Sequence, residues 1–144
     1  MVVFRIRVAL LDIEPPIWRS IELSSRTTLK QLHRILQIAM GWEDYHLHVF
    51  EGDGKRYGVP EPEDDELDIV IPEGRVRLGE VLPTPGARML YTYDYGDDWR
   101  HEILVESVEQ LDPNVEYPRV VAGARHCPPE DCGGPWAMPI SLKS

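Results

Sequence analysis

The segment from Leu90 to Glu106 constrains the fold most, because residues alternate with a period of two on both sides of a short Gly-Asp-Asp break. Such alternation is typical of strands with one buried face, so the segment is predicted to form a β-hairpin. With a three-residue loop, one face carries only aromatic, imidazole and aliphatic side chains, namely Tyr91, Tyr93, Tyr95, Trp99, His101, Ile103 and Val105. This register pairs Tyr93 with His101 and sets Asp94 opposite Arg100.

The composition limits the architecture and the class of partner. The chain has 144 residues, 42% of them hydrophobic, which is enough for a single domain over residues 1–144 with a real core. A net charge of −10 argues against a protein that wraps nucleic acid through phosphate contacts. The N-terminus lacks a signal-peptide pattern, and no apolar run approaches the roughly 18 residues of a membrane span. We therefore expect a cytoplasmic protein with no membrane segment.

The first sixty residues predict strands on either side of one helix. Residues 2–13 alternate, and after the turn at Glu14-Pro15-Pro16 residues 17–23 supply a second strand, so the two are expected to form a hairpin. Thr28 and Gln31 fit a capping box, apolar residues follow at helical spacing, and Gly41 ends the pattern, which predicts the main helix over residues 28–40. His33 lies at the edge of the apolar stripe, where a structural role is favoured.

The remaining segments are short. Trp42 to Glu51 is predicted as a loop and then a strand, residues 55–59 as a return strand, 61–68 as an acidic loop, 77–82 as a helical turn and 119–121 as a strand. This order indicates an α+β fold, in which a mixed or antiparallel sheet of hairpins packs on one main helix. The opening resembles a β-grasp, which by itself carries no function.

His46 and His48 form the first constellation with possible chemistry. Two residues apart in a predicted strand, both imidazoles project from one face, a spacing at which a sheet can offer two ligands to one metal ion. Histidines that face solvent from an edge strand explain the pattern equally well.

A second constellation surrounds the predicted turn and contains Asp94, Asp97, Asp98 and His101. A carboxylate held against an imidazole is the minimum for general acid or base chemistry. In the preferred register, however, His101 lies on the aromatic face and Asp94 on the other. This favours a structural interpretation, with an aspartate capping the turn and His101 packed between aromatic rings.

The third constellation is the segment from His126 to Gly134, where four residues, including Glu130 and Asp131, separate two cysteines. A Cys-x4-Cys pair lies at the outer edge of zinc-ligand spacing, and a tetrahedral site would need two more ligands from among the histidines. The candidate metal ligands are then His46, His48, Cys127 and Cys132. A loop with inert thiols and a reactive thiol are the alternatives.

Six motifs, in this order, resemble the plasmid pRiA ORF-3-like family: PPIWR (15–19), TLKQLH (28–33), MGWEDYHLHVF (40–50), YGVP (57–60), YTYDYGDDWRHEI (91–103) and CPPEDCGGPW (127–136). The resemblance covers residues 3–136. It implies a compact α+β domain that is widespread in prokaryotes and is sometimes carried on mobile elements. It brings no established activity.

One departure from the family pattern lies near the C-terminus. Family members continue past the Gly-Gly-Pro-Trp segment into a helical stretch, whereas this sequence reads AMPISLKS and reaches Ser144. The resemblance therefore implies a C-terminal truncation that leaves apolar surface near Trp136 uncovered. We expect such a patch to meet another chain, so self-association through the C-terminal region is predicted.

Three functional hypotheses follow, and none of the common catalytic motifs decides between an enzyme and a binding protein. The leading one is a non-enzymatic binding or interaction module, with a pocket lined by the 90–106 hairpin, the 45–50 strand and the 127–134 loop. Its ligand-binding residues would be Tyr93, Asp94, Trp99, His101, Glu130 and Asp131, and its partner a protein or a small molecule. The alternative is a metal-dependent hydrolase that uses His46, His48 and His101. A weaker one is a nucleic-acid-binding accessory protein of mobile elements.

Overall fold

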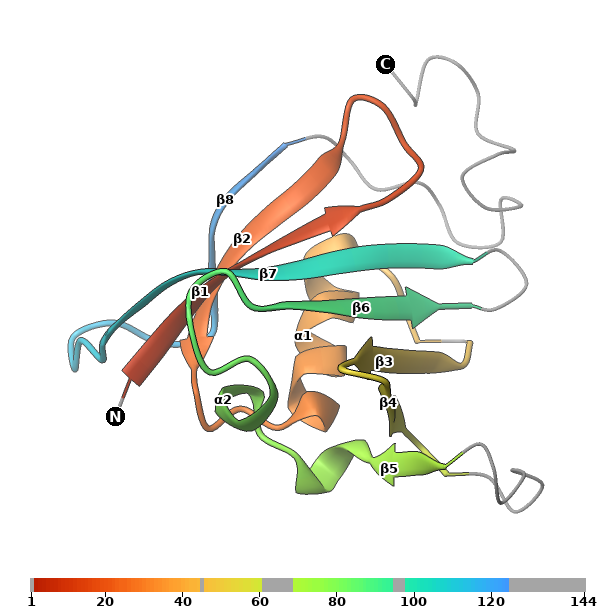
Figure 1. Cartoon of the computed structure of the whole chain (residues 1–144). Coiled ribbons are helices and arrows are strands. Elements are labelled where there is room, and N and C mark those ends of the chain that lie inside the picture. Colours follow the sequence, from red (N-terminus) through yellow and green to blue (C-terminus); the bar gives the residue numbers. More distant parts are fainter. Residues whose placement is uncertain (1, 45, 61–68, 95–97, 125–144) are drawn as a thin grey trace.

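In the computed structural model, which describes residues 2–44, 46–60, 69–94 and 98–124, the alternating segments form one mixed sheet with a helix against it (Figure 1). The elements are β1 (Val2–Leu10), β2 (Ile17–Ser24), α1 (Leu29–Met40), β3 (His48–Gly52), β4 (Lys55–Gly58), β5 (Val70–Pro72), the 3₁₀-helix η1 (Glu73–Arg75), α2 (Leu78–Val81), β6 (Arg88–Tyr93), β7 (Trp99–Gln110) and β8 (Arg119–Ala124). The predicted α+β class is confirmed. The acidic 61–68 segment and the cysteine segment lie outside the described residues.

The strand order β5-β4-β3-β6-β7-β1-β2-β8 brings the two halves of the chain together. β1 pairs with β2 as the predicted N-terminal hairpin and also with β7 from the second half. The pairs are antiparallel except for β4 and β5, which run parallel. The first strand of the chain, β1, therefore lies in the interior of the sheet between β7 and β2, and the main helix lies against one face (Figure 1).

The helix α1 forms as the sequence predicts. Gln31 donates its backbone N–H to Thr28 Oγ1 over 3.1 Å, and Thr28 donates its own N–H to Gln31 Oε1 over 3.0 Å, which completes the capping box. Gly41 ends the helix in the left-handed conformation, with φ of 76°. The apolar stripe packs into the core, but His33 and Gln37 also lie on the buried face of α1.

The register predicted for the central hairpin is wrong by two residues. Tyr93 pairs with Trp99 and Tyr91 with His101, because β6 ends at Tyr93 and a five-residue connection replaces the expected three-residue loop. Thr92, not Asp94, lies opposite Arg100, whose guanidinium donates to Asp12 over 2.9 Å. A shift of two residues keeps every side chain on its predicted face, so the aromatic face survives.

A second correction concerns β3, which begins at His48. His46 lies in the preceding loop, so the two histidines do not share one face of a strand as expected. Asp94 donates its backbone N–H to the Leu47 carbonyl over 2.8 Å, a contact that holds this loop against the end of β6. The predicted segments near 55–59, 77–82 and 119–121 are confirmed as β4, α2 and β8.

Candidate functional site: a buried histidine and carboxylate cluster

The buried face of α1 carries two polar side chains one turn apart, and both reach Tyr91 on β6. Gln37 Nε2 donates to Tyr91 Oη over 3.0 Å, and Gln37 Oε1 accepts from the backbone N–H of Asp44 over 2.9 Å. His33 Nδ1 lies 2.7 Å from the same Tyr91 Oη. The helix is therefore joined to the sheet by a polar network as well as by apolar packing.

The network assigns the tautomer of His33. Burial raises the pKa of Tyr91 well above its ordinary value of 10, so the phenol keeps its hydrogen. Since Tyr91 Oη already accepts from Gln37, it donates to His33 Nδ1, and His33 Nε2–H donates to Asp44 Oδ1 over 2.7 Å. This chain of three bonds is complete when His33 is neutral.

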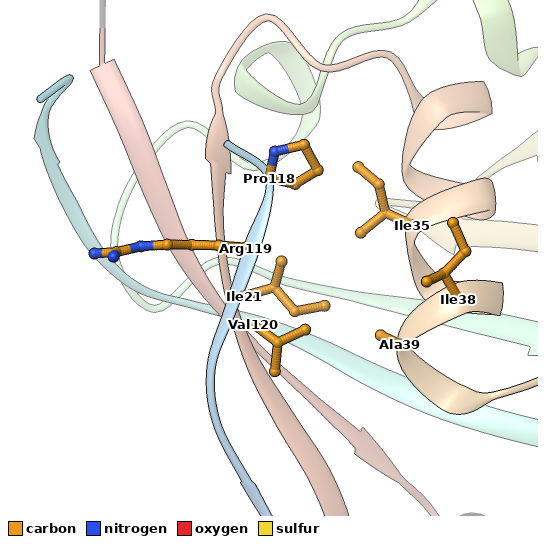
Figure 2. Close-up of a pocket in the computed structure, with 7 residues that line it drawn as sticks. All are labelled: Ile21, Ile35, Ile38, Ala39, Pro118, Arg119 and Val120. Carbon is orange, nitrogen blue, oxygen red and sulfur yellow. The ribbon is translucent and has the colours of Figure 1, made fainter. Parts of the chain in front are cut away.

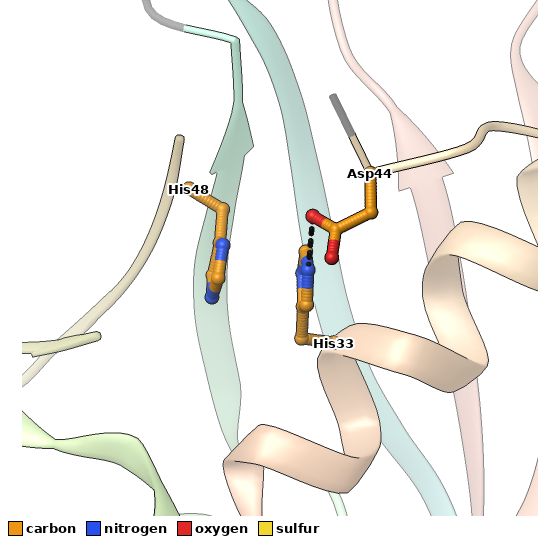
Figure 3. Close-up of side chains that lie close together, drawn as sticks. All are labelled: His33, Asp44 and His48. Atoms are coloured by element: carbon orange, nitrogen blue, oxygen red, sulfur yellow. Dashed lines mark hydrogen bonds and ion pairs between the residues drawn. The ribbon is translucent and has the colours of Figure 1, made fainter. Parts of the chain in front are cut away.

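His48 stacks on His33, and a carboxylate binds its outer edge. The two rings are stacked (Figure 3), with centroids 3.5 Å apart at an interplanar angle of 9°. His48 Nε2 lies 2.7 Å from Glu73 Oε2. Burial lowers the pKa of His33 below its ordinary value of 6.5, and the nearby His48 lowers it further, while Asp44 opposes both. Two positive rings at this spacing would repel each other.

Within the described ranges, one group of three side chains gathers ligand atoms closely enough to hold a metal ion. His33, Asp44 and His48 each place such an atom within 4.8 Å of the others. In the stacked arrangement the two rings lie in nearly parallel planes, and the lone pair of an imidazole nitrogen lies in the plane of its ring. A shared ion therefore requires one ring to turn.

The aromatic residues proposed as ligand-binding lie in the core. Tyr93, Trp99 and His101 are completely buried, and Trp42 contacts all three rings at centroid distances of 5.3–5.6 Å. His101 Nδ1 lies 3.2 Å from the Tyr91 carbonyl oxygen and donates to it. Burial lowers the pKa of His101 to about 4, so the ring is neutral at physiological pH. These residues are packed side chains without an accessible face in this structure.

The remaining predicted site residues do not join one centre in the described residues. His46 Nε2 lies 3.5 Å from Asp94 Oδ2, away from the carboxylate that binds His48. Neither His46 nor His101 belongs to the group formed by His33, Asp44 and His48. The other four, Cys127, Glu130, Asp131 and Cys132, lie outside the described residues.

A groove does follow the central hairpin and β3, but on the face opposite the aromatic residues. It has a volume of about 410 Å³ and is lined by Val49, Glu51, Arg56, Leu90, Thr92, Asp98 and Arg100. Its lining contains both signs of charge and none of the proposed aromatic residues.

Sequence reasoning missed three members of the cluster, namely Gln37, Asp44 and Glu73. One signal was available, because His33 and Gln37 are polar residues at i and i+4 on an otherwise apolar helix stripe, which predicts a buried polar network on the facing strand. Asp44 and Glu73 come from a loop and from η1, and no local pattern brings either to the helix.

The fold and this cluster define a class: an α+β protein whose main helix is linked to a mixed sheet by a partly buried cluster of histidines and carboxylates. Residues 2–143 match the plasmid pRiA4b ORF-3-like protein family, and the chain belongs to it. In the described part of the chain, neither helix has the length and apolar character needed to cross a membrane.

Two relatives illustrate the match. The chain is 38% identical over 137 residues to the uncharacterized protein y4hQ of Sinorhizobium fredii, covering 93% of this chain and 68% of the relative. It is also similar to the crystal structure of MM3350, a protein of unknown function from Methanosarcina mazei Go1, with a TM-score of 0.85 and 35% identity over 94% of this chain and 77% of that one. Both relatives are proteins without an assigned activity.

Proposed function

We propose that this protein is a non-enzymatic interaction module that binds an apolar segment of another protein. The observation that supports the proposal is an exposed aliphatic groove between α1 and β8 (Figure 2). Ile38 is 80% exposed and Val120 is 52% exposed, although both are large aliphatic residues. Adjoining exposed apolar side chains are more informative than single ones, because they mark surfaces that other molecules cover.

The groove is built by three segments that are distant in the sequence. It has a volume of about 230 Å³, and its lining is Ile21, Ile35, Ile38, Ala39, Pro118, Arg119 and Val120. Arg119 is the single charged residue of this lining. Its Nε donates to Glu22 Oε1 on β2 over 2.6 Å, so the guanidinium group is paired with a carboxylate on β2. No acidic side chain lines the groove, and a partner segment can bury aliphatic side chains there without stranding a carboxylate.

We assign the contact to this groove rather than to the edge of the sheet. β8 is the terminal strand in the described part of the chain, and terminal strands can accept another strand. Its pairing with β2 is interrupted, however, by a register shift beside Ile21, opposite Val120 to Ala122. Bulges of this kind disturb the ladder and discourage strand addition, so side-chain packing in the groove is the favoured mode.

Catalysis receives less support from the geometry. The imidazole and phenol groups of His33, Tyr91 and His101 are buried. His33 forms a hydrogen bond with the Tyr91 hydroxyl group, and His101 forms one with the Tyr91 carbonyl oxygen. A substrate would need direct access to such groups to exchange protons with them.

A peptide library displayed on phage provides the probe. We expect peptides selected on the purified protein to carry aliphatic residues and to bind at least about tenfold more weakly to Ile38→Glu, because a buried unpaired carboxylate is costly. Val120→Glu should act in the same way. Ile69→Glu is the matched control, since Ile69 is 72% exposed but does not line the groove.

Two results would contradict the proposal: the library yields no specific peptide, or the selected peptides bind Ile38→Glu and the unchanged protein equally well. Sedimentation of the protein alone tests one particular partner. If it forms dimers that Ile38→Glu abolishes, the groove binds a second copy of the chain, which is a different contact from the self-association predicted through the C-terminal region.

A further inference from the structure

Four side chains of the types that bind transition-metal ions gather beside α1. His33 comes from α1, Asp44 from the loop after it, His48 from β3 and Glu73 from η1. They form two pairs, His33 Nε2 with Asp44 Oδ1 and His48 Nε2 with Glu73 Oε2, each at 2.7 Å. The two rings stack with 3.5 Å between centroids, which brings the two pairs together. Figure 3 shows the stacked rings with Asp44. Imidazole and carboxylate are ligands of zinc and of iron in proteins.

Charge makes this place favourable for a cation. The cluster contains two carboxyl side chains, Asp44 and Glu73, of which Glu73 is buried, in a chain of net charge −10. A divalent cation bound between them would balance the charges of both carboxylates.

We propose that His33, Asp44, His48 and Glu73 form a binding site for one divalent transition-metal ion of the zinc type. With four protein ligands the site is closed, so the ion has a structural role that links α1, β3 and η1. This inference uses none of the groove residues and stands independently of the interaction module.

Loading the site requires a defined movement. A zinc ion lies about 2.0–2.1 Å from a ligating nitrogen and in the plane of the imidazole, so two parallel rings cannot hold the same ion. One ring must turn out of the stack, and each ligating nitrogen must be unprotonated, so the hydrogen of His33 moves from Nε2 to Nδ1, where Tyr91 Oη accepts it. The hydrogen bond from Nε2 to its carboxylate is then replaced by a shared metal ion. Asp44 provides the route of entry, because its side chain is 52% exposed while those of His33, His48 and Glu73 are at most 9% exposed.

Calorimetric titration of metal-stripped protein with zinc chloride tests the proposal. We expect saturation at one ion per chain, and weaker binding of magnesium, which prefers oxygen ligands in octahedral geometry. His48→Gln should lower the affinity for zinc by about 100-fold or more, since the loss of outer-shell partners alone costs about 10–100-fold. The ring resonances of His33 and His48 in the NMR spectrum should shift together as zinc is added, because the stack opens.

Matched variants keep the result interpretable if His48→Gln folds poorly. Asp44→Asn changes a half-exposed ligand and should also weaken zinc binding, whereas His46→Gln, outside the cluster, should bind zinc as the unchanged protein does. Circular dichroism verifies that each variant is folded. The proposal is overturned if zinc binding does not saturate, if Asp44→Asn and His48→Gln bind zinc normally, or if Cys127→Ser abolishes binding while those two variants retain it.

Discussion

At the scale of single residues, Tyr91 connects the helix to the sheet. Its hydroxyl group lies 2.7 Å from His33 Nδ1 and accepts from Gln37 over 3.0 Å, and the residue itself is completely buried. The buried hydroxyl group thus donates one hydrogen bond and accepts another, and no other group in the described network binds both His33 Nδ1 and Gln37 Nε2. The orientation of α1 on the sheet therefore depends on one oxygen atom as well as on apolar contacts.

Replacing that oxygen gives the first prediction. Tyr91→Phe leaves the ring in the core but strands His33 Nδ1 and Gln37 Nε2, and an unpaired buried polar group costs about 1–3 kcal/mol. We expect the free energy of unfolding, measured in urea, to fall by about 2 kcal/mol. Tyr57→Phe is the control, because no hydrogen bond of the Tyr57 hydroxyl exists among the described residues, and its effect should stay within about 0.5 kcal/mol. Equal effects of the two variants would contradict this role for Tyr91.

The second prediction concerns pH and His101. Burial lowers the pKa of His101 from 6.5 to about 4. Between these values the unfolded chain binds a proton that the folded protein does not, so the free energy of unfolding rises with pH in this window. The contribution is fully present above pH 6.5, is lost as the pH falls towards 4, and amounts to roughly 3 kcal/mol.

Urea unfolding at a series of pH values measures this contribution. His101→Phe replaces the imidazole by an aromatic ring that does not titrate, and the variant should lose most of the slope between pH 6.5 and 4. The slope that remains includes His33, whose pKa is also lowered. An identical pH profile in the unchanged protein and in His101→Phe would show that the imidazole does not carry the effect.

At the scale of elements, the capping box fixes where α1 begins. Thr28→Ala removes the side chain that accepts from Gln31 N–H, and loss of such a cap costs about 1 kcal/mol, within a range of about 0.5–2. We expect a lower midpoint of thermal unfolding, followed by circular dichroism. Thr27→Ala is the control at the neighbouring position. Thr27 donates its backbone N–H to the Ser24 carbonyl, and this bond does not depend on its side chain. If Thr27→Ala destabilises the protein as much as Thr28→Ala, the cap is not the cause.

The elements also show what local sequence can and cannot specify. The helix and the N-terminal hairpin follow from signals within a few residues of each other, namely Thr28 with Gln31, Gly41, and the proline turn. The register of the central hairpin could not be predicted from such local signals, because the length of its loop depends on contacts with residues distant in the sequence. Asp94 is held in a left-handed conformation, with φ of 61°, and bonds to the Leu47 carbonyl across the sheet.

The candidate cluster was only partly predictable for the same reason. His48 was recognised as a candidate ligand, and the polar residues of the helix stripe could have indicated a buried network. Their carboxylate partners come from positions 44 and 73, which the fold brings to the helix through the path of two loops. The expected grouping of His46 with His48 assumed that a strand begins earlier than it does.

At the scale of the whole molecule, the order of strands makes the two halves of the chain depend on each other. β1 lies between β2, its neighbour in sequence, and β7, which starts almost ninety residues later. Ile6 and Val8 on β1 are fully buried, and the aromatic residues of β6 and β7 belong to the same core cluster. Neither half can bury its apolar face without the other.

We therefore expect one cooperative unfolding transition, as is usual for a domain of this size. Trp42 and Trp99 report the packing between helix and hairpin by fluorescence, whereas far-ultraviolet circular dichroism reports the sheet and helix as a whole. The two urea curves should coincide, with one midpoint and one slope. Native-state amide hydrogen exchange should be slowest in β1, which is paired on both sides. It should be faster in β5 and β8, which lie at the ends of the strand order. Separate fluorescence and dichroism midpoints would instead divide the chain into two units and would contradict this dependence on β1.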